Sequence, residues 1–529
     1  MPLLGSDEAI RLLRLARPKS IESDPQAAFV SKWVSHRWKL LSAPPPLIEP
    51  SHSLDKNFLL GDQLPASDLD NVILFLIGKP GSGKSFLSEM ITKRRLGNHP
   101  TIVISQDECG SKEMCETEIS REWPSKTLLI FDRCNPRSKD RKAWLKKVHP
   151  ARRPIAIYFD FDKTLCKQRI DQRLGHPTIR AGRGVKALDE MDKTMETPTL
   201  NEGFKTVIRI TSFTAANELA VKWLTSPVPL RKFPRTPHLI DTGASTEDDL
   251  VCDIFPANGI LEGNLTIEEK IDGANLGISL DHDLKLVIQN RSHLIHDTVS
   301  GQFKGTDAWL REHSTALFDI LHQDPAFPER YILYGEWCQA RHSIQYNRLT
   351  DKFLAFDLYD RLSDTNCSRR VITKLLKGSG IAQVPFIKYC DTITKEEVLA
   401  IIQGRSAFAS KPTSASKQDE SLSRMEGIYI RLEDPKRLIC EARGKVVRSD
   451  FLAGDAKHWS RTDTMWNRTK LEAGESELRD ERDWDKETMT SLGPTEISRA
   501  GSRGRIGALM ETEDEEGKLE EMGKSLTLQ

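Results

Sequence analysis

The chain has 529 residues, of which 29% are charged and 38% hydrophobic, a composition typical of a soluble protein with more than one domain. Lysine plus arginine equals aspartate plus glutamate at 77 each, so no overall basic excess indicates a nucleic-acid partner, although a local basic groove is compatible with this balance. The 9 cysteines include no CxxC pair, which argues against a structural zinc site and a disulfide framework and indicates a reducing compartment, the cytoplasm or the nucleus. No run approaches about 18 apolar residues, so we expect no membrane span.

Residues 1–70 are interpreted as an N-terminal extension with no recognisable chemistry. Leucines and arginines at helical spacing in MPLLGSDEAIRLLRLARPKS predict an exposed or docking helix. The acidic residues in this stretch argue against a targeting peptide, and import into an organelle is the alternative. The prolines of SAPPPLIEP indicate a boundary or a rigid loop, and no feature of the chain indicates an obligate protein partner.

Residues 71–225 and 229–470 have different strand patterns. The first range has continuous apolar runs, which predict a doubly wound α/β domain with a parallel sheet: NVILFLIG, TIVIS, TLLIFD, IAIYFDF and KTVIRI. The second range has shorter, alternating strands, which predict an α+β domain with an antiparallel sheet: LTIEEKIDGANLGISL, LKLVIQN, ERYILYGEW, KFLAFDLYD and EGIYIRLED. The proline-rich segment 225–239 predicts a linker, 411–424 a flexible loop, and the charged tail 471–529 a disordered segment.

The segment GKPGSGKS matches the phosphate-binding pattern GxxxxGK[ST]. It follows an apolar strand and opens the helical stretch KSFLSEMITKR, which is the context that this motif requires. Its glycines allow backbone N–H groups to wrap phosphates at a helix N-terminus. We expect Lys84 on the β- and γ-phosphates of ATP and Ser85 on Mg²⁺. The predicted nucleotide-contacting residues of this loop are Gly78, Gly81, Gly83, Lys84 and Ser85.

Three further polar residues belong to this predicted site. Asp107 follows the second strand, where an acid can accept the proton of an attacking hydroxyl, although an N-cap aspartate is the alternative. Arg169 and Arg173 lie four residues apart on one helix face, which could close over a triphosphate or simply be solvated.

Four strings together resemble the kinase domain of polynucleotide 5′-kinases over most of 71–212: QDECGSKE, LLIFDRCNPRSKDRKAWL, CKQRIDQR and TPTLNEGFKTVIRI. The resemblance implies that Asp107 is the general base for a polynucleotide 5′-OH, and that Arg169 and Arg173 belong to a lid over ATP. Asp132 and Asn135 match a family segment near the acceptor and receive no firm role.

The string YFDFDKTL contains the DxDxT pattern of haloacid-dehalogenase-type phosphatases. Lys163 stands where that motif usually has glycine, and the lid-like arginines follow at once. A short motif out of context is weak evidence. We therefore interpret Asp160 and Asp162 as the end of the fourth strand of the kinase-like domain.

A second lysine of interest is Lys270, in the strand-like stretch TIEEKIDGANLGISL. A deprotonated lysine amine can attack the α-phosphate of ATP, giving a lysine–AMP phosphoramidate and pyrophosphate. The alternative is a surface strand lysine before a turn, because a lone KxDG string is common.

Six strings in order and spacing resemble the ATP-dependent RNA ligases over about 230–455: EEKIDGANLGI, IQNRSHLI, LYGEWCQARHSIQY, FLAFDLYD, MEGIYIR and EARGKVVRSDF. The resemblance implies that Lys270 is the adenylylated nucleophile. It also implies that Arg291 contacts the ribose or the incoming phosphate, and that Glu336 binds ribose hydroxyls.

The remaining roles implied by this resemblance fall on later residues. Phe356 would stack on adenine, Glu426 would help bind Mg²⁺, and Lys445 would neutralise the α-phosphate. The family pattern at the last motif is KxK, and here Arg443 replaces the first lysine, so its geometry differs. Arg448 is a further candidate.

The two halves together predict an enzyme that phosphorylates 5′-OH ends of RNA and then joins them to 3′-OH ends, using ATP and Mg²⁺. The alternatives are a DNA-end repair kinase–ligase, because contacts to the phosphate backbone are shared, and an RNA-end sensor that does not seal. The segment HWSRTDTMWNR, 458–468, either extends the ligase-like fold or contacts RNA through tryptophans and arginines.

Overall fold

The computed structural model describes residues 53–54, 59–61, 69–95, 100–105, 109–172, 184–243, 250–252, 255, 258–409, 424–451 and 465–472. The chain divides into two compact units, one comprising residues 1–88 and 99–224 and the other 89–98 and 225–529. None of the described helices is long and apolar enough to cross a membrane. The predicted N-terminal helix and charged tail lie outside the described residues, as does nearly all of the predicted loop 411–424.

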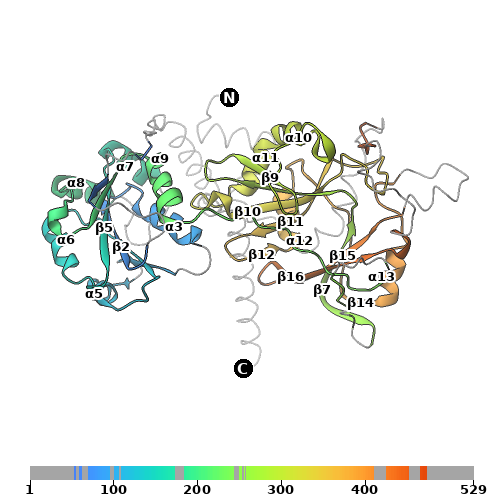
Figure 1. The fold of residues 1–529 in the computed structure, drawn as a ribbon, viewed down its shortest axis with the longest axis horizontal. Coiled ribbons are helices and arrows are strands. Elements are labelled where there is room, and N and C mark those ends of the chain that lie inside the picture. The colour runs from blue at the N-terminus through green and yellow to red at the C-terminus, as the bar shows by residue number, and fades with distance from the viewer. Residues whose placement is uncertain are drawn as a thin grey trace, which may run out of the picture. The chain divides into compact units, whose positions relative to one another are not determined.

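In the described part of the first unit, a six-stranded sheet has the order β1-β6-β5-β2-β4-β3 (Figure 1). Strands β2 to β6 pair in parallel, which confirms the predicted parallel sheet, whereas β1 pairs antiparallel with β6 at the edge. Strand β1 falls inside the range that the sequence assigned to the N-terminal extension. The strands are β1 Leu59–Gly61, β2 Val72–Gly78, β3 Thr101–Ser105, β4 Leu128–Asp132, β5 Arg153–Phe159 and β6 Thr206–Ile210.

Helices cover both faces of this sheet, and Figure 1 shows α6 and α8 on one side and α9 on the other. All seven residues of β2 are buried, as expected for a central parallel strand between two helical layers. The helical segments are α3 Lys84–Arg94, α5 Lys112–Ser120, α6 Ser138–Leu145, α7 Lys163–Gln172, α8 Gly184–Thr194, η2 Leu200–Glu202, α9 Phe213–Glu218 and η3 Leu219–Leu224.

The second unit contains a sheet with the order β14-β7-β15-β16-β12-β11-β10-β8-β9, with β13 beside β11. Its pairings are antiparallel except that of β13, which confirms the predicted antiparallel sheet. The strands are β7 Ile260–Lys270, β8 Ala274–Leu280, β9 Leu286–Gln289, β10 Tyr331–Trp337, β11 Phe353–Asp360, β12 Thr365–Cys367, β13 Ala382–Gln383, β14 Phe386–Thr394, β15 Gly427–Asp434 and β16 Ile439–Val447. The helical segments are η4 Gly301–Phe303, α10 Thr306–Glu312, α11 Ser314–Leu321, η5 Pro328–Arg330, α12 Arg369–Leu376, α13 Lys395–Ile401 and η6 Ser449–Phe451.

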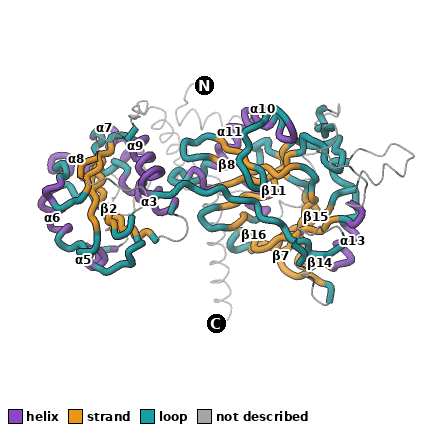
Figure 2. Tube along the Cα trace, viewed as in Figure 1, coloured by secondary structure: helices purple, strands orange, loops and turns teal. Residues whose placement is uncertain are grey.

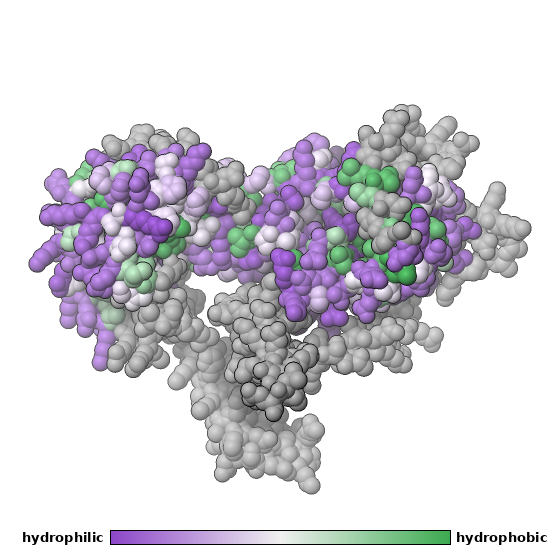
Figure 3. All heavy atoms as spheres, turned by 90° about the horizontal axis from the view of Figure 1, so that it is seen from below, coloured by the Kyte–Doolittle hydropathy of each residue, from purple (hydrophilic) through white to green (hydrophobic). Residues whose placement is uncertain are grey.

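Long loops connect the strands of this second sheet, as the teal segments of Figure 2 show. The predicted linker lies between η3 and β7, before the first strand of this sheet, and part of it is hydrogen-bonded to β16. The backbone N–H of Lys445 donates to the carbonyl of Pro237 (2.8 Å), and the N–H of Leu239 donates to the carbonyl of Lys445 (2.9 Å). On the face that Figure 3 shows, hydrophilic residues cover most of the described surface of each unit. The linker therefore contributes to the second unit as a docked segment.

Candidate functional sites

The predicted phosphate-binding segment GKPGSGKS forms a loop of the first unit that joins β2 to α3, as predicted. Gly81 has φ +78° and Gly83 φ +94°, a backbone region that favours glycine. A Cβ atom on Gly81 would also lie 2.4 Å from the carbonyl oxygen of Cys166 on α7. The Nζ of Lys84 donates to the carbonyls of Gly78 (3.0 Å) and Lys79 (2.8 Å), so this lysine folds back over the loop.

Two other polar side chains lie at this loop. The Oγ of Ser82 is buried and has no hydrogen-bond partner among the described residues, which suits a group that contacts a bound anion. Arg169 on α7 lies beside the loop, where its Nη1 is 3.4 Å from the carbonyl of Gly81. Ser85 is exposed at the start of α3. Asp107 and Arg173 lie outside the described residues.

A cavity of about 430 Å³ opens next to the loop. Arg169 lies over the ring of Phe161 in its wall, 4.9 Å from the ring centroid. Phenylalanine faces and an arginine plane are surfaces on which a nucleobase can stack. The lining residues are Ser82, Gly83, Phe86, Leu87, Phe159, Phe161, Arg169, Phe213 and Ala216.

The aspartates of YFDFDKTL have structural partners. Asp160 accepts a hydrogen bond from Nε of Arg209 on β6 (2.8 Å), and its N–H donates to the carbonyl of Ile210 (2.8 Å). Asp162 accepts from the N–H of Thr164 (2.7 Å) at the start of α7. Both residues therefore lie just after β5, the fourth parallel strand along the chain, as predicted.

One buried ion pair connects two of the strings that carry the kinase resemblance. Arg141 is fully buried and donates through Nε and Nη2 to both carboxylate oxygens of Glu202 (2.7 Å each). Its Nη1 donates to the carbonyls of Asn135, Pro136 and Glu196. This arginine therefore fixes the loop after Asp132, the last residue of β4, against the TPTLNEGF segment.

The second candidate site is centred on Lys270, the last residue of β7. Its Nζ lies 2.6 Å from the carboxylate of Glu426 and 5.9 Å from the ring centroid of Tyr429. The strand register explains this meeting, because Gly427 on β15 lies opposite Lys270 and Tyr429 lies opposite Lys445 on β16. Two sequence-predicted residues thus meet, Lys270 at the end of β7 and Glu426 just before β15, and a third, Lys445, lies on the next strand, β16.

Glu336 approaches the same lysine from another part of the sheet. It pairs with Asn275 across β10 and β8, and its carboxylate accepts a backbone hydrogen bond from Gly273. Burial raises the pKa of Glu336 to about 8, although Lys270 acts in the opposite direction. Burial alone would lower the pKa of Lys270, but the negative charge of Glu426, followed by Tyr429 and Glu336, raises it above its usual value. Lys270 is therefore held as an ammonium and must lose a proton before it can act as a nucleophile.

We expect formation of a covalent lysyl–AMP to accelerate as pH rises from about 6 to 9, by up to about tenfold per unit where proton loss from Lys270 limits the rate. Deprotonation of Glu336, with its pKa of about 8, adds a carboxylate beside Lys270 over the same range, which raises the pKa of the lysine and makes the acceleration less steep than tenfold per unit. The measurement is single-turnover labelling of the protein by ATP at saturating Mg²⁺. Joining of a pre-adenylylated strand, which needs no free lysine, is the control and should vary less with pH. A labelling rate that falls over this range would contradict the prediction.

Phe356 lies at a β-bulge. Asp357 pairs with Tyr334 and Ala355 with Gly335, which leaves Phe356 as the extra residue of β11. Bulges change the direction of a side chain and are common beside active sites. The ring of Phe356 packs edge-on against Phe233, with centroids 5.6 Å apart.

The sequence analysis missed Phe233, the buried phenylalanine of the linker string KFPRTPHL. Its ring lies 4.8 Å from that of Tyr334 and 4.5 Å from the guanidinium carbon of Arg443. Its N–H donates to the carbonyl of Arg291 (2.8 Å), whose side chain is exposed. A phenylalanine between a lysine and a proline in a proline-rich linker was the available signal. Phe233 touches three residues to which the resemblance gave nucleotide-binding roles.

Asp272, two residues after Lys270, fixes the loop that follows Glu336. Its Oδ2 accepts from the N–H groups of Ser343 (2.7 Å) and Ile344 (2.9 Å). Its own N–H donates to the hydroxyl of Tyr346 (2.9 Å). The aspartate of KIDG therefore has a positioning role that the sequence did not reveal.

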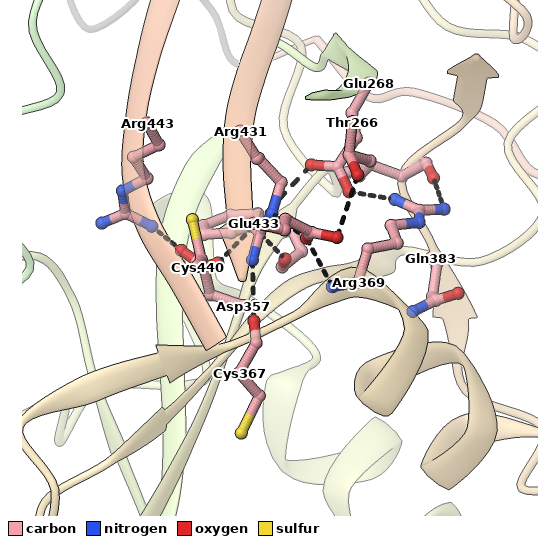
Figure 4. Close-up of polar contacts among 12 residues, drawn as sticks. Thr266, Glu268, Asp357, Cys367, Arg369, Gln383, Arg431, Glu433, Cys440 and Arg443 are labelled. Atoms are coloured by element: carbon pink, nitrogen blue, oxygen red, sulfur yellow. Dashed lines mark hydrogen bonds and ion pairs between the residues drawn. The ribbon is translucent and has the colours of Figure 1, made fainter. Parts of the chain in front are cut away.

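Arg443 belongs to a buried group of charged residues (Figure 4). It forms an ion pair with Asp357, the residue after Phe356. Arg431 forms ion pairs with Asp357 and Glu433 (3.2 Å to the latter) and donates to the carbonyl of Cys367 (2.9 Å). The group comprises three carboxylates and three guanidinium groups, which balance in charge: Glu268, Asp357, Glu433, Arg369, Arg431 and Arg443.

Arg443 occupies the position where the family pattern has lysine, and within this buried group its structural partner is Asp357. A guanidinium can pair with a carboxylate and stack on a ring at the same time, as Arg443 does with Asp357 and Phe233. Arg448 pairs with Asp450 (3.0 Å). The basic residues predicted in the last motif are Arg443, Lys445 and Arg448. Of these, Lys445 lies opposite Tyr429 in the strand register, and the ring of Tyr429 lies next to Lys270.

The carboxylates around Lys270 fit a magnesium ion. Within the described ranges, no group of three or more His, Cys, Asp or Glu residues is arranged to hold a metal. Mg²⁺ on a nucleotide needs fewer protein ligands, because it takes one or two carboxylates together with phosphate oxygens and water. Glu426 and Glu336, both beside Lys270, provide such a pair.

Residues 263–447 match the RNA ligase family model. The transcription factor bHLH140 of Arabidopsis thaliana is 29% identical over 162 residues, which cover 29% of this chain and 17% of that protein. A mutant of Naegleria gruberi RNA ligase with ATP and Mn is 17% identical with a TM-score of 0.26, and the match covers 36% of this chain and 52% of that one. The same ligase with PPi is 18% identical with a TM-score of 0.28, over 44% of this chain and 64% of that one. The chain thus spans less than two thirds of each of these proteins.

Proposed function

We propose that this protein repairs RNA ends in two steps, phosphorylating a 5′-OH end and then joining the 5′-phosphate to a 3′-OH. The observation that carries the proposal is the Lys270–Glu426 pair, 2.6 Å apart, inside the region that matches the RNA ligase model. The phosphate-binding loop of the first unit supplies the second half of the proposal. Both steps use ATP, and the product of the first is the substrate of the second.

In the sealing step, the deprotonated Nζ of Lys270 attacks the α-phosphorus of ATP. The bond from that phosphorus to the bridging oxygen breaks, pyrophosphate leaves, and AMP stays on the lysine. The AMP then passes to the 5′-phosphate of RNA, and the 3′-OH attacks that phosphate and releases AMP. Lys445 would offset the charge of the α-phosphate, and Phe356, held by Phe233, would contact the base. Mg²⁺ bound near Glu426 and Glu336 would neutralise phosphate charge.

In the phosphorylation step, the 5′-OH attacks the γ-phosphorus of ATP and ADP leaves. Lys84 and the N–H groups of the loop would bind the phosphates, and Arg169 would stabilise charge that develops during transfer. The aromatic cavity beside the loop would receive the base of the donor nucleotide. Asp107 remains the proposed general base.

Replacing Lys84 with alanine is expected to separate the two steps. The variant should lose 5′-phosphorylation by about a hundredfold or more, since it lacks the cation on the transferred phosphate. It should still seal a nick that already carries a 5′-phosphate. The measurement follows both products on nicked duplexes, in RNA and DNA versions, and the better-sealed nick identifies the polymer.

The matched control is Lys112→Ala, which removes an exposed lysine of the same unit and should leave both steps unchanged. If Lys84→Ala seals a 5′-OH nick as fast as the wild type does, the loop has no part in healing. If the wild type seals neither RNA nor DNA nicks with a 5′-phosphate, the joining step is wrong.

A further inference from the structure

Residues 465–472, which lie beyond the region matching the RNA ligase model, are built into the second unit. The carbonyl of Met465 accepts from the N–H of Arg341 (2.8 Å), and the N–H of Lys470 donates to the carbonyl of Leu349 (2.9 Å). Asn467 is buried, and its side chain accepts from the N–H of Tyr346 (2.9 Å) and donates to the carbonyl of Cys338 (3.0 Å). This part of the segment HWSRTDTMWNR therefore extends the fold.

The residue before Asn467 is held at the surface instead. Trp466 is 39% exposed and Met465 is 56% exposed. Exposure of two adjacent large apolar side chains is notable because the segment that carries them is docked on the protein and could have buried them. The Nζ of Lys304 lies 5.4 Å from the centroid of the Trp466 ring. The exposed Arg468 follows two residues later, and Nη1 of Arg341 contacts Sδ of Met465 (3.8 Å). We call Lys304, Arg341, Met465, Trp466 and Arg468 the tryptophan patch.

The tryptophan patch is connected to the candidate sealing site through one short loop. Arg341 donates its N–H to Met465, and two and three residues later Ser343 and Ile344 donate their N–H groups to Asp272. Asp272 in turn lies two residues after Lys270. A ligand on the patch would therefore lie on the loop that borders Lys270.

We propose that the tryptophan patch binds a single-stranded stretch of the RNA next to the end that is joined. An indole ring offers a stacking surface to any base, and the lysine and two arginines around it complement backbone phosphates. Such a combination binds without regard to sequence, which suits an enzyme that acts on ends. The proposal rests on the sealing function proposed above and assigns the surface that receives its polynucleotide substrate.

The test uses the full chain and RNA that carries a 4-thiouridine near a 5′-phosphate. After irradiation, the cross-linked peptide should contain Trp466, and Trp466→Ala should remove most of this cross-link. The same variant should raise the KM for a pre-adenylylated RNA strand about tenfold, whereas labelling of the protein by ATP should not change. Trp466→Phe keeps a ring and should recover part of the effect.

The matched control is Leu471→Ala, which removes another apolar side chain of the same segment, 70% exposed, from outside the patch. It should cross-link and seal as the wild type does. A Trp466→Ala variant with an unchanged cross-link and an unchanged KM for RNA would overturn the proposal. Failure of the proposed function gives a different result, in which the cross-link at Trp466 forms but the wild type takes no label from ATP and seals no RNA.

Discussion

Replacing Lys270 with arginine is expected to abolish transfer of AMP from ATP to the protein, by more than about a thousandfold. Arginine keeps the positive charge and can still pair with Glu426, so the buried carboxylate would not lose its partner. However, a guanidinium does not deprotonate in proteins and cannot act as the nucleophile. The variant therefore separates loss of the nucleophile from loss of charge.

The measurement is transfer of the labelled α-phosphate of ATP to the protein on a denaturing gel, which retains covalent adducts. Lys285→Arg is the matched control, because Lys285 is 74% exposed in the same unit, and it should label as the wild type does. Phosphorylation of 5′-OH ends should be unaffected in both variants. Labelling of Lys270→Arg at the wild-type level would mean that another residue accepts AMP.

Replacing Arg431 with methionine is expected to destabilise the second unit by about 3–5 kcal/mol, which is the typical cost of removing one partner of a buried ion pair. Arg431 is 2% exposed, and its loss leaves Asp357 and Glu433 with fewer compensating charges in the interior. Methionine fills a similar length without a charge. The destabilised region lies near the candidate site, because Asp357 forms ion pairs with both Arg431 and Arg443.

Urea unfolding of the full chain, followed by tryptophan fluorescence together with the labelling activity of Lys270, measures this effect. Arg311→Met is the matched control, because the side chain of Arg311 is 75% exposed on α10 and pairs with Asp307 at the surface. We expect it to change stability by less than about 0.5 kcal/mol. A midpoint for Arg431→Met equal to that of the wild type would show that the buried charges contribute no net stability.

The hydrophobic patterns of the sequence were enough to predict both sheets. Strands buried on both faces of a parallel sheet are continuously apolar, whereas strands with one buried face in an antiparallel sheet alternate apolar and polar residues. They did not predict β14, whose residues FIKYCDTIT are mostly half-buried or exposed and which lies at the edge of its sheet. The GKPGSGKS motif and the strings around Lys270 could be recognised because each is local in sequence.

Contacts between distant segments could not be predicted in the same way. Phe233 meets Phe356 across more than a hundred residues, and Arg431 meets Asp357 through the order of β15, β16, β12 and β11, which no local pattern encodes. The sequence indicated that Arg443 departs from the family pattern. Its ion pair with Asp357 was visible only when the strands were assembled.

We propose that one protein heals and seals the same RNA end, and one labelling experiment tests this function most directly. A nicked RNA duplex with 3′-OH and 5′-OH termini is incubated with Mg²⁺ and ATP labelled in the γ-phosphate, and the products are treated with phosphatase. We expect the label in the sealed strand, resistant to phosphatase, because the γ-phosphate becomes the phosphate of the new bond. A label that stays at a phosphatase-sensitive 5′ end, or a sealed strand without label, would contradict the proposal.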